Sequence, residues 1–229
     1  MRALHFMKID YILTRKQLYI VPVFFILALV TSSGFGKGGT SLIVAFSYML
    51  FVASIFSTAP FGYCVGKSRG FLLLLPASVK DRVVGRFLYG LSFVALLSLL
   101  CGVLAGVYVL MVEEEVPLWL WGISLCEMAA AIVLMVLEFL FFYLFGEGKE
   151  NWQYLNNIVR VAPGMAMFFA VSAFIGEVQD AAASGTGMDP EAMTGKFMQA
   201  GVAAVVVSLL LTAVAAAVCV KVIEKRDYA

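Results

Sequence analysis

Residues 197–220, FMQAGVAAVVVSLLLTAVAAAVCV, form an apolar run of 24 residues that contains no charged side chain. A helix that crosses the hydrocarbon core of a bilayer needs about 20 mainly apolar residues, because every backbone N–H and C=O must find its hydrogen bond inside the helix. This stretch therefore predicts a membrane-spanning helix.

Five further stretches share this apolar character, namely residues 18–33, 41–62, 87–112, 118–145 and 161–176. The chain of 229 residues is 62% hydrophobic, whereas an ordinary soluble domain is about 45 to 50% apolar. The sequence thus predicts an all-α fold, a polytopic membrane protein with six transmembrane helices in one domain over residues 1–229.

Lysine and arginine are distributed unevenly over the segments between these stretches. Of the 16 basic residues, 14 lie in four segments: before the first stretch, between the second and third, between the fourth and fifth, and after the sixth. The other two, Lys37 and Lys196, lie in the alternate loops. Since short basic loops stay in the cytoplasm, we expect both termini to be cytoplasmic and the loops near Lys37, Glu113 and Asp180 to face outward. Membrane topology accounts for the basic residues, so no nucleic-acid partner is expected.

The N-terminal residues 1–17 interleave apolar side chains with Arg2, Lys8, Asp10 and Arg15. Such a pattern is typical of an amphipathic helix that lies on the cytoplasmic membrane surface, with its basic side chains toward the lipid headgroups. The alternative is an unstructured basic tail that serves only as a topology signal.

A second cytoplasmic segment, residues 63–86, connects the second and third stretches. Its apolar run 71–75 is too short to cross a bilayer and ends at Pro76. Ser78 can cap a helix that runs into the third stretch. The predicted helix after Ser78 contains Lys80, Asp81 and Arg82. The segment either rests in the membrane interface or fits a groove on a soluble partner.

Two acidic residues, Glu127 and Glu138, lie inside the fourth stretch. They are 11 residues apart, which at about 100° per residue places both carboxyls on one face of a helix. Ionisable groups inside a membrane normally point to the bundle interior or to a water-filled cavity, so both are candidates for a transport path. The structural alternative is that each is protonated or hydrogen-bonded to a neighbouring helix.

Several kinds of chemistry are excluded by what the chain lacks. His5 is the single histidine, which rules out a histidine-based metal centre and a Ser-His-Asp triad. Residues 34–40, GFGKGGT, lack the spacing of a phosphate-binding loop, so no nucleotide site is assigned. The acidic run 113–115 is interpreted as a solvated feature of the outer face, with a substrate-attracting or ion-binding role as the alternative. We expect no catalytic, metal-binding or cofactor-binding residue on this chain.

The overall layout resembles the small permease subunits of type-2 ABC exporters. The resemblance is carried by the basic amphipathic segment ahead of six spans and by residues 70–82, GFLLLLPASVKDR, which are similar to the "LPxSRxD" stretch that follows the second span in bacterial antibiotic- and peptide-export permeases. This chain has Val79 and Lys80 where many members have Ser or Thr followed by Arg.

The resemblance implies a separate soluble ABC ATPase as partner, with ATP and Mg²⁺ bound there, so that this chain is not an enzyme by itself. In the family, the segment after the second span is the coupling helix that docks on the ATPase, and the N-terminal segment is an elbow helix. Residues 151–160, with Trp152 and Tyr154, would form a second, smaller contact. The coupling residues carried over are Phe71, Leu72, Leu75, Pro76, Lys80, Asp81 and Arg82.

The resemblance also implies a pair of permease chains, most simply a homodimer, in the plasma membrane, by analogy a bacterial inner membrane. The cargo would be an amphipathic peptide, a lipid or a hydrophobic compound, as in exporters of phenol-soluble modulins and bacitracin-type peptides that confer resistance to antimicrobial peptides. Two other classes stay open: an ion- or proton-coupled carrier that uses Glu127 and Glu138, and a membrane protein that confers peptide immunity without transport.

Overall fold

The computed structural model describes residues 2–34, 40–64, 78–112, 116–146, 173 and 194–227. Regular structure in these residues is helical throughout, which confirms the all-α class. The elements are α1 (Arg2–Leu18), α2 (Val21–Gly34), α3 (Thr40–Ser57), the 3-10 helix η1 (Ala59–Cys64), α5 (Val79–Val112), α6 (Leu118–Phe141), the π-helical turn η3 (Phe142–Gly146) and α8 (Thr194–Asp227).

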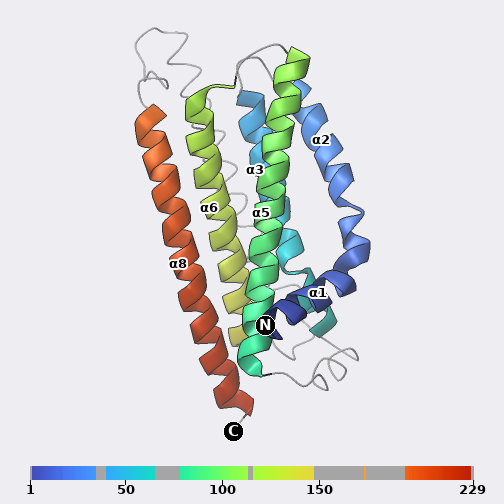
Figure 1. Cartoon of the computed structure of the whole chain (residues 1–229), viewed down its shortest axis with the longest axis vertical. Helices are drawn as coiled ribbons and strands as arrows, with labels where there is room; N and C mark the ends of the chain where they lie inside the picture. Colours follow the sequence, from blue (N-terminus) through green and yellow to red (C-terminus); the bar gives the residue numbers. More distant parts are fainter. Residues whose placement is uncertain are drawn as a thin grey trace.

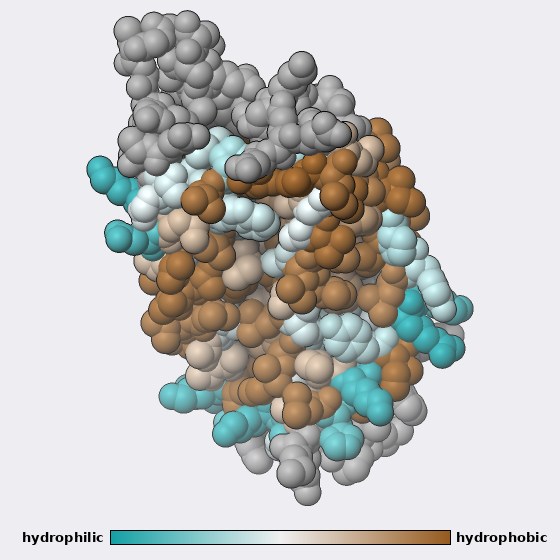
Figure 2. All heavy atoms as spheres, turned by 45° about the horizontal axis from the view of Figure 1, so that its top comes forward, coloured by the Kyte–Doolittle hydropathy of each residue, from teal (hydrophilic) through white to brown (hydrophobic). Residues whose placement is uncertain are grey.

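The long helices run side by side along the long axis of the molecule (Figure 1). α8 packs on α6, α6 packs on α3, and α3 packs on α2, while α5 lies against α3. Four segments in the described part are long and apolar enough to cross a membrane: Leu42–Phe61, Val79–Met111, Leu118–Phe145 and Thr194–Arg226. On the face seen in Figure 2, hydrophobic residues cover the middle and hydrophilic residues gather toward the two ends, as a bilayer requires.

The first predicted span, residues 18–33, differs from the structure. α2 has 14 residues and is too short by itself to cross a bilayer of about 30 Å, since a helix rises about 1.5 Å per residue. α1 and α2 meet at a bend of 68° between Lys16 and Val21, and together they could make a fifth span. Hydropathy located the apolar residues here but could not show the bend.

The third and sixth predicted spans are longer than hydropathy indicated. α5 begins at Val79, eight residues before the predicted start, and α8 continues to Asp227, seven residues past the predicted end. Each has 34 residues, about 50 Å of helix, so its polar end projects beyond a hydrocarbon layer of about 30 Å. The fourth predicted span, residues 118–145, agrees with the structure at both ends. α6 begins at Leu118, directly after Pro117, and η3 continues it to Gly146.

The fifth predicted span, residues 161–176, lies outside the described residues except for Ala173. The two chain termini lie toward the same end of the bundle, the lower end in Figure 1. The start of α5 and the end of α8 lie at that end too (Figure 1). That this end faces the cytoplasm stays a prediction from the charge pattern.

Candidate functional site

Ser78 caps the start of α5 at the lower end of the bundle. The Ser78 hydroxyl accepts a hydrogen bond from the Asp81 backbone N–H at 3.1 Å and donates one to Asp81 Oδ2 at 2.6 Å. The Ser78 carbonyl accepts the N–H of Arg82 at 3.2 Å. The bond from the Asp81 N–H satisfies a donor that a helix start would otherwise leave without a partner, the Arg82 bond is the first regular bond of the helix, and the Asp81 carboxyl lies near the positive end of the helix dipole. The cap predicted at Ser78 is confirmed.

One turn further along, α1 crosses α5 at Gly85. A Cβ atom at this glycine would lie 2.6 Å from Phe6 Cβ and 2.7 Å from the carbonyl oxygen of Ala3. Both distances are well below van der Waals contact, so the close approach of the two backbones requires glycine here. The amphipathic helix predicted over residues 1–17 is therefore confirmed as a helix, and it is packed on α5.

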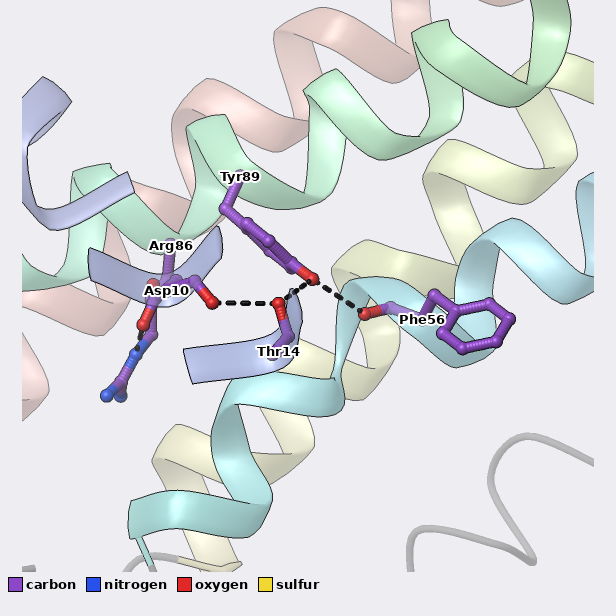
Figure 3. A network of polar contacts seen from close by, with 5 residues as sticks. All are labelled: Asp10, Thr14, Phe56, Arg86 and Tyr89. Carbon is purple, nitrogen blue, oxygen red and sulfur yellow. Dashed lines mark hydrogen bonds and ion pairs between the residues drawn. The ribbon is translucent and has the colours of Figure 1, made fainter. Parts of the chain in front are cut away.

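An ion pair joins the same two helices. Asp10 of α1 is 2% exposed, and its Oδ2 lies 3.8 Å from Arg86 Nε of α5 (Figure 3). Burial raises the pKa of Asp10 from 3.8 to about 6, and the nearby Arg86 guanidinium partly offsets that rise. Near neutral pH the pair thus consists of an ionised acid and a guanidinium, both largely shielded from water.

Hydroxyl groups extend this contact to α3. Thr14 donates a hydrogen bond to the Asp10 carbonyl at 2.8 Å, and its oxygen lies 3.0 Å from the Tyr89 hydroxyl. Tyr89 in turn reaches the carbonyl of Phe56 at 3.5 Å, near the end of α3 (Figure 3). We refer to Asp10, Thr14, Arg86 and Tyr89 as the elbow junction. It connects α1, α5 and α3 through buried polar groups.

Aromatic side chains link the elbow junction to the lower ends of α6 and α8. The Arg86 guanidinium lies 5.4 Å from the ring centre of Phe61 in η1, within the range of a cation–π contact. Phe61 stacks on Phe142 of η3 with ring centres 4.0 Å apart. Arg226 of α8 donates hydrogen bonds to the carbonyls of Tyr143 and Leu144 at 3.0 and 2.5 Å. These contacts thus connect six elements at the end of the bundle where α5 starts, namely α1, α3, α5, η1, η3 and α8.

The second group of interest lies higher in the bundle, between α3 and α6. Glu127 is 3% exposed, and its Oε1 accepts a hydrogen bond from the Ser47 hydroxyl. Its Oε2 has no hydrogen-bond partner among the described residues. A buried carboxyl oxygen without a partner is costly, so this position can accept a proton or a polar group.

Glu138 is also fully buried on α6, three turns below Glu127. The expectation that both acids point into the bundle agrees with their burial, whereas a role in transport stays a prediction. Among the described residues, no group of three His, Cys, Asp or Glu side chains is placed to hold a metal ion.

The predicted coupling residues fall into two sets. Lys80, Asp81 and Arg82 form the first turn of α5, with Lys80 exposed and the other two half-buried. The remaining four lie outside the described residues, as does the smaller predicted contact with Trp152 and Tyr154; the four are Phe71, Leu72, Leu75 and Pro76.

Comparison with known proteins decides the family. The model of a family described as ABC-2 family transporter protein matches residues 5–224, nearly the whole chain. The chain belongs to the ABC-2 transporter family. Comparisons with the curated proteins and with the solved structures found no match.

An ABC-2 membrane subunit is a multi-pass protein of the cell membrane, and its ATPase lies on a partner subunit. The membrane subunit of this family is typically non-catalytic and carries no cofactor. The elbow junction lies where α1 and the start of α5 meet, at the end of the subunit that the charge pattern assigns to the cytoplasm.

Sequence reasoning did not identify the elbow junction as a site. A signal was present, because Met7, Asp10 and Thr14 recur at helical spacing and Met7 packs on the core. An acid and a hydroxyl on the apolar face of an amphipathic helix indicate a polar partner on a neighbouring helix.

Proposed function

We propose that this chain is the permease subunit of an ATP-driven exporter that moves amphipathic peptides or hydrophobic compounds out of the cell. Membership of the ABC-2 family carries the proposal, and the packing at the start of α5 supports it. A transporter subunit without a nucleotide-binding motif needs a separate source of energy, and a soluble ABC ATPase supplies it.

The ATPase would bind the coupling segment, residues 63–86. Phe71, Leu72, Leu75 and Pro76 would enter a groove on the ATPase, while Lys80, Asp81 and Arg82 would contact its rim. Because α5 continues without a break from Val79 to Val112, a displacement of its first turn moves the whole span.

The elbow junction would distribute that displacement to other helices. The Gly85 contact and the Asp10–Arg86 pair tie α1 to α5, and Tyr89 and Phe61 connect α5 to the lower end of α3. Interfaces packed this closely move as units rather than deforming continuously. In a pair of permease chains, most simply a homodimer, this motion would open a cavity between the two copies to the outside.

Affinity purification of the tagged chain from membranes tests the partner. We expect a soluble ABC ATPase to copurify, and we expect at least about tenfold less of it with Leu75→Asp and with Lys80→Glu/Arg82→Glu, because hot-spot losses of 2 kcal/mol or more have that size. Lys196→Glu is the matched control, since Lys196 is an exposed base at the opposite end of the bundle.

Equal recovery of the ATPase with the coupling variants would show that it binds elsewhere. Recovery of no ATPase with any variant, from membranes in which the chain is folded, would refute the exporter proposal. Cargo is then identified by comparing peptide and drug export from cells that contain or lack the chain.

The unpaired Glu127 oxygen favours one alternative, an ion- or proton-coupled carrier that uses Glu127 and Glu138. Glu127→Gln/Glu138→Gln retains side-chain size but removes the ability to exchange a proton. Transport that follows a pH gradient and is lost in this double variant would support the carrier; ATP-dependent transport that persists in it would support the exporter.

A further inference from the structure

α6 and α8 touch through glycines near their upper ends. A Cβ atom at Gly201 would lie 2.6 Å from the Gly122 carbonyl oxygen, and one at Gly122 would lie 2.6 Å from the backbone of Phe197. At the lower end, Arg226 binds the carbonyls of Tyr143 and Leu144. The two helices are therefore held together at both ends.

Between these contacts the helices leave a groove of about 310 Å³. Among the described residues, only aliphatic side chains line it, including Val133, Leu137 and Leu140 of α6 and Leu211, Val214 and Val218 of α8. Its volume is at the lower limit of ligand pockets, about 300 to 1,000 Å³. Val214 is 62% exposed, so the groove opens sideways toward the surroundings of the bundle.

Two exposed lysines follow the groove toward the lower end of α8. Lys221 lies about one turn beyond Val218, and Lys225 lies two turns beyond it on nearly the same side of the helix, about 10 Å further along the axis. Arg226 points instead to α6. An aliphatic groove that ends at two cations matches the chemistry of an anionic lipid, in which a hydrocarbon chain is attached to a phosphate.

We propose that this groove binds one acyl chain of an anionic phospholipid of the adjacent leaflet, with the lipid phosphate against Lys221 and Lys225. The site is distinct from the coupling segment and does not depend on the identity of the cargo.

A second permease copy fits this face less well than a lipid. A two-fold interface through the groove would bring Lys221 and Lys225 of both copies to the same depth and close to their equivalents, and like charges at such contacts repel. Helix pairs in membranes also favour small residues at the contact, whereas bulky leucine and valine side chains form the groove walls.

Native mass spectrometry of the purified, delipidated full-length chain tests the proposal, with phosphatidylglycerol and phosphatidylcholine as the two probes. We expect tight binding of one phosphatidylglycerol per chain. Val214→Trp fills the groove and should weaken binding of both lipids at least about tenfold. Lys221→Gln/Lys225→Gln should abolish the preference for phosphatidylglycerol while leaving the weaker binding of phosphatidylcholine.

Leu209→Trp is the matched control, because Leu209 is a similarly exposed residue on the opposite side of the same helix. Lipid binding that is equal in Val214→Trp, the double lysine variant and this control would overturn the proposal. Loss of dimer by Val214→Trp with unchanged lipid binding would identify the groove as a contact between two chains and would overturn it too. Because the lysine variant leaves the groove walls intact, it keeps the test decisive if the tryptophan variants fold poorly.

Discussion

Three acidic side chains of the described residues are buried in this bundle, and the surroundings of two of them, Asp10 and Glu127, differ. Asp10, at the lower end, has its Oδ2 3.8 Å from the Arg86 guanidinium, an ion pair without a hydrogen bond at that oxygen within the described part of the chain. Its backbone carbonyl accepts the Thr14 hydroxyl in a set of polar contacts that joins three helices. Glu127, higher in the bundle, has one hydroxyl partner, Ser47, and one carboxyl oxygen without any among the described residues. Both acids are at most 3% exposed.

This difference indicates that Asp10 connects helices, whereas Glu127 is a position where a group could bind. A buried acid with a cationic partner on a second helix holds those helices in one arrangement, and breaking the pair leaves an uncompensated charge. A buried acid whose partner among the described residues is a neutral hydroxyl, with no cation beside it, retains the capacity to bind a proton or a polar group. We therefore propose that Asp10 and its partners transmit movement, and that Glu127 is the position where a proton would act in the carrier alternative.

The largest effect is expected from Arg86→Ala. Removing one member of a buried ion pair destabilises a protein by about 3 to 5 kcal/mol, and the partial exposure of Arg86 places this case at the lower end. Thermal unfolding in detergent measures the loss, with Lys80→Ala at an exposed position of the same helix as control. Equal melting temperatures for the two variants would show that the pair does not hold α1 on α5.

The titration of Asp10 gives the next largest effect. Its pKa is about 6 in the folded state and near the ordinary value of 3.8 in the unfolded state. Between these pH values the folded state therefore binds more protons than the unfolded state. Stability should accordingly fall as pH rises from about 4 to about 6 and then level off, by up to about 3 kcal/mol at 1.36 kcal/mol per pKa unit.

Asp10→Asn isolates this contribution from other carboxyls. The difference in melting temperature between wild type and variant should change over the same pH interval and stay constant above it. A difference that is independent of pH would mean that Asp10 does not titrate in this range.

Gly85→Ala should disturb the elbow junction by sterics alone. Its new methyl group would meet Phe6 and Ala3 at under 3 Å, and overpacking of this kind typically destabilises by about 1 to 3 kcal/mol. Gly102→Ala on the same helix meets nothing within 4 Å and should be neutral or slightly stabilising, because alanine favours helix. Thermal unfolding should show a lower melting temperature for Gly85→Ala and an equal or slightly higher one for Gly102→Ala. The same change in melting temperature for both variants would contradict the close contact at Gly85.

Ser47→Ala should have the smallest effect of the four. It leaves Glu127 without its hydroxyl partner, at a cost of about 1 to 2 kcal/mol, whereas Ser47→Ala combined with Glu127→Met removes both polar groups and should recover most of that stability. A double-mutant cycle in thermal unfolding measures the coupling. Additive losses would show that the two side chains do not interact.

Sequence patterns were sufficient for features that are local along the chain. Apolar length located the fourth span at both ends, and the position of Ser78, just after Pro76 and just before the helix, predicted the cap of α5. The periodicity of residues 1–17 predicted α1, and the 11-residue separation of Glu127 and Glu138 placed both on the buried side of α6.

Features that depend on packing between distant segments could not be predicted in this way. Asp10 and Arg86 are 76 positions apart, and only the close approach of α1 at Gly85 brings them together. The bend between α1 and α2 and the groove between α6 and α8 likewise arise from helix contacts, for which hydropathy carries no signal.

Transport by the purified chain in vesicles, with and without its ATPase and ATP, tests the central claim most directly. The account predicts that cargo moves only when the chain, the ATPase and ATP are all present. Transport at full rate by the chain alone, without nucleotide, would contradict it.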